Sequence, residues 1–113
     1  MHAAALDRLD AADIRDAAEK AWGATLRATN ALVLTRTGVE PEKSPATSAA
    51  LNALASEDPA VRTLVGRYYS RQSQLHGECF YLGLCDPAPE TERRIRETAG
   101  YIDDAEALAR SGG

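Results

Sequence analysis

His76 is the residue of this chain best suited to general acid–base catalysis near neutral pH, because the other histidine, His2, lies at the terminus. Arg71 precedes His76 by five residues. The stretch from Pro59 to Gly77 contains no acidic residue, although the whole chain carries a net charge of −4. Its basic residues are Arg62, Arg67 and Arg71. Because guanidinium groups bind phosphate through paired hydrogen bonds, this stretch predicts a site for a phosphate-bearing ligand.

Polar and aromatic side chains accompany His76. Tyr69, Ser73, His76 and Phe80 are separated by 4, 3 and 4 residues, which places them on one face of a helix. We therefore take Tyr69, Ser73 and Arg67 as candidate residues for positioning RNA or a nucleotide. The alternative is a solvated helix face whose arginines pair with acids of the first and fourth helices, and the residues alone leave this alternative open.

Four helices must position these side chains. Apolar residues recur at helical spacing over residues 13–36, 46–55, 59–84 and 90–110. Prolines after Ser44 and Asp58 mark the starts of the second and third helices, and the proline after Asp86 marks the break before the fourth. Glycines weaken the third helix, so a kink is expected near Gly77. The pattern predicts an all-α, up-down four-helix bundle, with long first and third helices and a short second one.

The composition agrees with one helical domain spanning residues 1–113, with a core of about residues 13–110. The chain has 113 residues, 44% of them hydrophobic but only 5% aromatic, so its core must come mainly from small aliphatic side chains. Trp22 is predicted to be a packing anchor between helices. Cys79 and Cys85 are interpreted as buried, reduced thiols, because their spacing matches neither a CxxC motif nor a zinc site. The inward-facing residues of the fourth helix are predicted to be Ile95, Ala99, Ile102, Ala105 and Leu108.

Charge and hydropathy exclude some functions. A net charge of −4 disfavours broad, non-specific nucleic-acid binding but leaves room for a local basic site. No apolar run is long enough to span a bilayer, and the first residues do not form a signal peptide, so we expect a cytoplasmic protein without membrane contact. We expect neither a metal nor another cofactor.

Two motifs resemble a known family. Arg71 to His76 forms an Arg-x4-His element in the last long helix before the terminal one, which is similar to the HEPN (higher eukaryotes and prokaryotes nucleotide-binding) superfamily. The stretches Ala18–Ala24 (AEKAWGA) and Leu75–Tyr81 (LHGECFY) resemble its PaREP branch. The resemblance extends over roughly residues 13–108 and implies a HEPN-like bundle.

The resemblance also implies a mechanism. HEPN ribonucleases are metal-independent dimers whose paired Arg–His elements face a shared cleft. Carried over to this chain, His76 is the general acid or base, and Arg71 binds the scissile phosphate. Gln72 departs from the Asn, Asp or His that many active members have after the arginine. Residues five apart lie about 140° apart on an ideal helix, so Arg71 and His76 meet only if the helix deforms or a second subunit supplies the other half.

Three functions remain open at this point. The first is a HEPN-like module, as a homodimer, that binds a nucleotide, RNA or a protein partner such as a nucleotidyltransferase-like chain. The second is a toxin-like, metal-independent endoribonuclease that uses Arg71 and His76 at the dimer interface. The third is a purely structural bundle.

Overall fold

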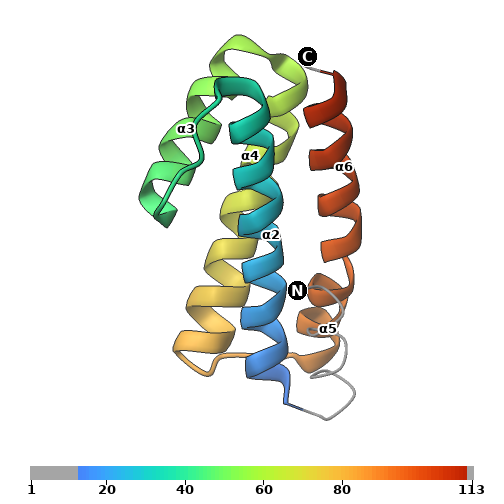
Figure 1. Cartoon of the computed structure of the whole chain (residues 1–113). Helices are drawn as coiled ribbons and strands as arrows, with labels where there is room; N and C mark the ends of the chain where they lie inside the picture. The colour runs from blue at the N-terminus through green and yellow to red at the C-terminus, as the bar shows by residue number, and fades with distance from the viewer. Residues whose placement is uncertain (1–12, 112–113) are drawn as a thin grey trace.

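The structure, a computed structural model, describes residues 13–111 as a bundle of helices (Figure 1). Every regular element within these residues is helical, which confirms the all-α fold class. α4 runs directly into η1, and one residue separates α5 from α6, so this part of the chain forms four rods. In chain order the elements are α2 (Ile14–Thr37), α3 (Ser44–Glu57), α4 (Pro59–Arg71), η1 (Gln72–Tyr81), α5 (Ala88–Arg96) and α6 (Thr98–Ser111).

α2 matches the first predicted helix to within one residue at each end. The Asp13 side chain accepts a hydrogen bond from the Asp16 backbone N–H at 3.2 Å and so caps the start of the helix. Gly38 ends it in the left-handed conformation, with φ of 78°, where a residue without Cβ is favoured. The N-terminal residues on which we based the absence of a signal peptide, and His2, lie outside the described residues.

α3 and α4 form a helical hairpin. α3 covers 14 residues and is longer than predicted, because the helix already begins at Ser44, and Lys43 is its N-cap. Asp58 separates the two helices, and its carboxylate accepts a hydrogen bond from the Ala60 N–H at 2.9 Å. This bond is the main cause of the lowered pKa of Asp58. In Figure 1, α3 lies beside α4 and does not extend along η1.

The third predicted helix changes its geometry in its second half, which contains Gly77. Residues 72–81 adopt a π-helix, η1, which replaces the expected end of an α-helix. Arg15 of α2 holds the end of η1, since its Nε donates to the Phe80 carbonyl at 3.1 Å and its Nη2 to the same oxygen at 2.6 Å. Gly83 then turns the chain away with φ of 73°.

This turn brings Cys85 back beside Cys79. The two residues form a disulfide, with their Cα atoms 4.3 Å apart, so the expectation of reduced thiols is wrong. Spacing alone pointed away from a redox or metal motif, but it carried no information on how the chain turns after η1. Both cysteines are buried, as expected.

The fourth predicted helix is split at Glu97 into α5 and α6. The split changes which residues face inward. Thr98 and Tyr101 are buried together with Ile95 and Ala105, whereas Ala99 is exposed. Ile102 and Leu108 are half-buried. The single 3.6-residue period was therefore right for Ile95 and Ala105, wrong for Ala99, and missed Thr98 and Tyr101.

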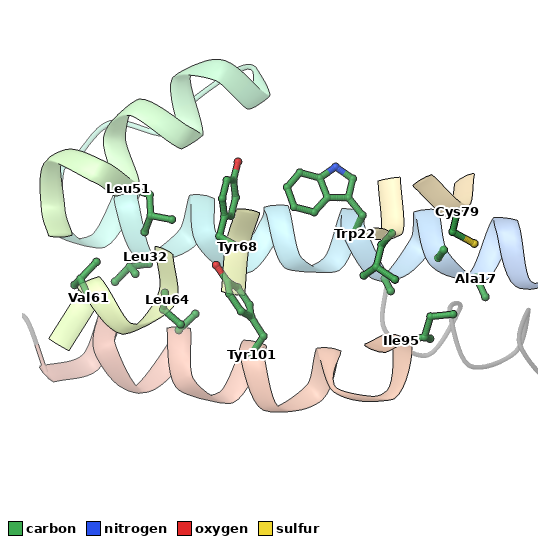
Figure 2. Close-up of a cluster of buried hydrophobic side chains, with 14 of the residues drawn as sticks. Ala17, Trp22, Leu32, Leu51, Val61, Leu64, Tyr68, Cys79, Ile95 and Tyr101 are labelled. Carbon is green, nitrogen blue, oxygen red and sulfur yellow. The ribbon is translucent and has the colours of Figure 1, made fainter. Parts of the chain in front are cut away.

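The core lies along α2. Trp22 is 5% exposed and its ring centroid is 5.3 Å from that of Tyr68, which confirms its role as a packing anchor. Figure 2 shows Tyr101 extending from α6 towards α2, whereas the Trp22 indole lies on the side of α2 away from α6. In the described range, 13–111, no helix has the length and apolar character to cross a membrane.

Candidate functional site

Arg71 lies on the side of the third rod that faces α5 and α6. It is 7% exposed, and its guanidinium donates to three partners on three different helices. Nε donates to Thr25 Oγ1 of α2 at 2.8 Å, and Nη1 donates to the Arg94 carbonyl of α5 at 3.0 Å. Nη2 donates to Thr98 Oγ1 of α6. The split between α5 and α6 leaves the Arg94 carbonyl available, and Arg71 satisfies it.

An aromatic ring completes this environment. The Arg71 guanidinium carbon is 5.9 Å from the centroid of the Tyr101 ring, and the Tyr101 hydroxyl is 2.7 Å from Thr29 Oγ1. Burial lowers the pKa of Arg71 to about 10, so the side chain is still charged at neutral pH. We call Arg71 and its partners Thr25, Thr98, Tyr101 and the Arg94 carbonyl the Arg71 flank.

His76 lies on the other side of the third rod. Its Nδ1 is 2.8 Å from Glu19 Oε1 of α2, and the imidazole side chain is 41% exposed. Its ring is stacked on Phe80, with centroids 6.1 Å apart, and lies 6.2 Å from the Trp22 ring. We call His76, Glu19, Trp22 and Phe80 the His76 flank.

The structure does not bring the two motif residues together. All three guanidinium nitrogens of Arg71 are occupied by Thr25, Thr98 and a backbone carbonyl, and the side chain is nearly inaccessible. A second subunit could not receive this guanidinium at its His76 without breaking those bonds. Arg71 also continues the buried stripe of the third rod, with Tyr68 three residues before it and Leu75 four residues after it.

The other candidate residues are spread over both sides. Arg67 Nη1 forms an ion pair with Asp104 of α6 at 2.7 Å, which is the pairing with a fourth-helix acid that we considered as the alternative. Tyr69 is exposed, and its hydroxyl accepts a hydrogen bond from Asn52 of α3 at 2.7 Å. Ser73 is exposed on η1. None of the three contacts His76 through a hydrogen bond, ion pair or ring contact within residues 13–111.

A groove opens between α4–η1 and α5, and four arginines line it. Its volume is about 510 Å³. We call it the arginine groove; its lining residues are Thr63, Gly66, Arg67, Ser70, Arg71, Gln74, Arg93, Arg94 and Glu97. The sequence reasoning found Arg67 and Arg71 but missed Arg93 and Arg94. The sequence does show a pair of arginines near the start of the fourth predicted helix. It does not show that this pair lies opposite α4.

The charges of the groove are only partly neutralised. Arg93 pairs with Glu90 at 2.6 Å and with Glu97 at 2.5 Å, and these hydrogen bonds raise the pKa of Arg93. The Arg94 guanidinium, by contrast, donates no hydrogen bond and has no ion pair within 4 Å among the described residues. In the same part of the chain, no group of three or more His, Cys, Asp or Glu side chains could hold a metal ion.

Comparisons with known proteins do not assign this site. No protein-family model, curated protein or solved structure matches the chain. The HEPN resemblance therefore stays a prediction that depends on the sequence motifs alone.

Proposed function

We propose that this protein is a HEPN-like helical domain that binds a phosphate-bearing ligand, a nucleotide or RNA, in the arginine groove. The observation that carries the proposal is the convergence of Arg67, Arg71, Arg93 and Arg94 on one groove of an otherwise acidic protein. Arginine is the side chain best matched to phosphate oxygens, because its planar fork donates two parallel hydrogen bonds.

The groups in the groove have different tasks in this proposal. Arg71 is already saturated by protein partners, so it shapes the wall and adds positive potential without contacting the ligand. Arg94 is the first contact, because its guanidinium has no ion-pair partner to give up among residues 13–111. Arg67 and Arg93 follow, since their ion pairs are solvent-exposed and exposed pairs are weak. A phosphate dianion competes well with a single carboxylate for such a guanidinium.

The test is equilibrium binding of fluorescently labelled ATP and single-stranded RNA at low ionic strength. We expect Arg94→Gln to weaken binding about tenfold, because it removes one charge-assisted hydrogen-bonding group. Arg96→Gln is the matched control, since Arg96 has the same charge on the same helix but lies outside the groove. Equal losses for the two variants would reduce the effect to net charge and would remove the groove as the binding site.

A second candidate function is the metal-independent endoribonuclease, and the contact between His76 and Glu19 favours it. A carboxylate that holds Nδ1 of a histidine orients the ring and leaves Nε2 for proton transfer. Arg71 cannot be the phosphate ligand of His76 in the arrangement described above. This function therefore needs a phosphate ligand other than a buried Arg71.

Its test is cleavage of single-stranded RNA in EDTA by the wild type, His76→Ala and Arg71→Lys. We expect His76→Ala to abolish cleavage if this activity exists, and cleavage that survives the substitution removes His76 as the catalytic residue. Homodimerisation and a nucleotidyltransferase-like partner remain predictions from the resemblance. They are tested by the solution mass and by co-purification.

A further inference from the structure

The residues that line the arginine groove indicate which part of a ligand it recognises. This inference rests on the proposed function. The described side chains that line the groove are arginines, hydroxyls, an amide and a carboxylate, with no aromatic or aliphatic side chain among them. Proteins that recognise bases stack them on aromatic rings or on arginine guanidinium planes, or enclose them between apolar walls. The groove has no ring and no aliphatic side chain for a base among these lining residues, and its guanidinium groups, the one planar surface that it offers, are also its charged donors for phosphate.

The nearest ring is not available as a platform. Tyr101 is fully buried, and the guanidinium carbon of Arg67 lies 5.3 Å from its ring centroid. The guanidinium of Arg71 lies 5.9 Å from the same centroid. The two arginines already occupy the cation–π positions of this ring, so it contributes to the groove by holding their positive charges.

The arginines are arranged on two opposite walls. Arg67 projects from α4, and Arg93 and Arg94 project from α5, which lies across the groove. Cations on facing walls suit a compact group that carries several negative charges, because each wall can bind a different phosphate of the same group. A nucleic-acid backbone spreads one charge per nucleotide along its length and presents fewer charges to a groove of this size.

We infer that the arginine groove binds the polyphosphate tail of a nucleotide and leaves the base outside. Recognition then depends on the number of consecutive phosphates and is indifferent to the base. The polar groups Ser70 and Gln74, which line the same groove, supply further hydrogen-bond donors to phosphate oxygens.

The experiment is a competition series in EDTA against labelled ATP, so that the arginines alone neutralise the phosphates. We expect inorganic tripolyphosphate and ATP to bind within about threefold of each other, and AMP to bind at least about tenfold more weakly, because AMP loses the contacts to one wall. We expect a 5′-hydroxyl RNA oligonucleotide to compete only weakly.

A substitution at Gly66 locates the binding. A Cβ at Gly66 meets nothing within 4 Å, so Gly66→Leu places a side chain in open groove space and leaves all four arginines unchanged. We expect this variant to lose tripolyphosphate binding at least about tenfold, because the leucine occupies the ligand volume. Gly100→Leu is the matched control, since a Cβ there also meets nothing within 4 Å and Gly100 lies outside the groove.

The outcomes separate this inference from the proposed function. ATP that binds while tripolyphosphate fails to compete overturns the inference and supports recognition of the base, with the proposed function intact. RNA that competes more strongly than tripolyphosphate also overturns it, in favour of the nucleic-acid backbone. Equal losses in Gly66→Leu and Gly100→Leu overturn the location. If neither ATP, tripolyphosphate nor RNA binds, the proposed function itself fails.

Discussion

The Arg71 flank and the His76 flank belong to the same rod but hold their charged side chains in different ways. Helices α2, α5 and α6 enclose Arg71, and each of them gives it a hydrogen-bond acceptor. His76, by contrast, has one hydrogen-bonding partner within residues 13–111, Glu19 of α2. Its rod continues below α3, which does not extend along η1 (Figure 1). The Arg-x4-His pair therefore divides into a buried residue that joins helices and a partly exposed residue with one carboxylate beside it. Stability should therefore depend much more on Arg71 than on His76.

Arg71→Ala should have the largest effect on stability. The substitution leaves Thr25, Thr98 and the Arg94 carbonyl without their donor, and buried polar groups without partners are costly. We expect the free energy of unfolding to fall by about 3 kcal/mol or more. Urea unfolding followed by the fluorescence of Trp22, the one tryptophan, measures the change.

Arg67→Ala is the matched control for Arg71→Ala. It removes an arginine of the same rod whose ion pair with Asp104 is solvent-exposed, so we expect a loss below about 1 kcal/mol. Arg71→Lys keeps the charge but cannot reproduce three donors in a fork, and it should resemble Arg71→Ala more than the wild type. Similar stabilities for Arg71→Ala and Arg67→Ala would contradict the stabilising role of the three buried Arg71 hydrogen bonds.

Tyr101 makes the stability of the Arg71 flank depend on pH. Burial raises the pKa of the Tyr101 phenol to about 12, above its ordinary value of 10.0. Below pH 10 the Tyr101 phenol keeps its proton in both the folded and the unfolded state. Its contribution to the free energy of unfolding is therefore fully present. Between pH 10 and 12 the unfolded chain loses the proton first, so this contribution, about 2 to 3 kcal/mol, is lost as the pH rises.

The measurement is the difference in unfolding free energy between the wild type and Tyr101→Phe from pH 8 to 11.5. The lowered pKa of Arg71 makes the folded state more stable as the pH rises, which opposes the effect of Tyr101. Both proteins contain Arg71, so most of its effect cancels in the difference. At pH 8 the wild type should be more stable by about 1 kcal/mol, because of the bond between Tyr101 and Thr29. The sign should reverse above pH 10, and a difference that stays constant with pH would show that the phenol is not shielded.

Local patterns predicted the rods well and their interruptions poorly. Asp13, Gly38 and Asp58 have well-defined capping chemistry, and the observed helix ends agree with it. The split at Glu97 has no such signal, because the Arg94 carbonyl is satisfied by a residue 23 positions earlier in the chain. The π-helical geometry of η1 is likewise stabilised from outside, by Arg15 at its end.

The sequence predicted which residue types the candidate site contains. It did not predict which neighbouring helix each side chain faces. The acid-free stretch drew attention to Arg67 and Arg71, and both residues line the groove. The apolar spacing of Leu64, Tyr68 and Leu75 already placed Arg71 on the buried face, but the motif drew attention to its charge instead. Arg93 and Arg94 join the site only through tertiary packing, and a single sequence does not show which helix faces which.

Reduction of the disulfide between Cys79 and Cys85, at the end of η1, should have a moderate effect on stability. Cys79 and Cys85 are six residues apart, so their bond constrains a short loop, and we expect its loss to lower the free energy of unfolding by about 2 kcal/mol. Urea unfolding with and without dithiothreitol measures the change. The double variant Cys79→Ser, Cys85→Ser is the control and should not respond to the reductant.

Substitution of His76 or of Glu19 should have the smallest effect on stability. His76 and Glu19 are 41% and 31% exposed, so water replaces the partner that either substitution removes. We expect His76→Ala and Glu19→Gln each to change the free energy of unfolding by less than about 1 kcal/mol. A larger loss, approaching that of Arg71→Ala, would mean that His76 is a structural residue like Arg71. A small loss leaves His76 as a side chain that the fold does not need, which is the condition for reading any change in RNA cleavage as chemistry.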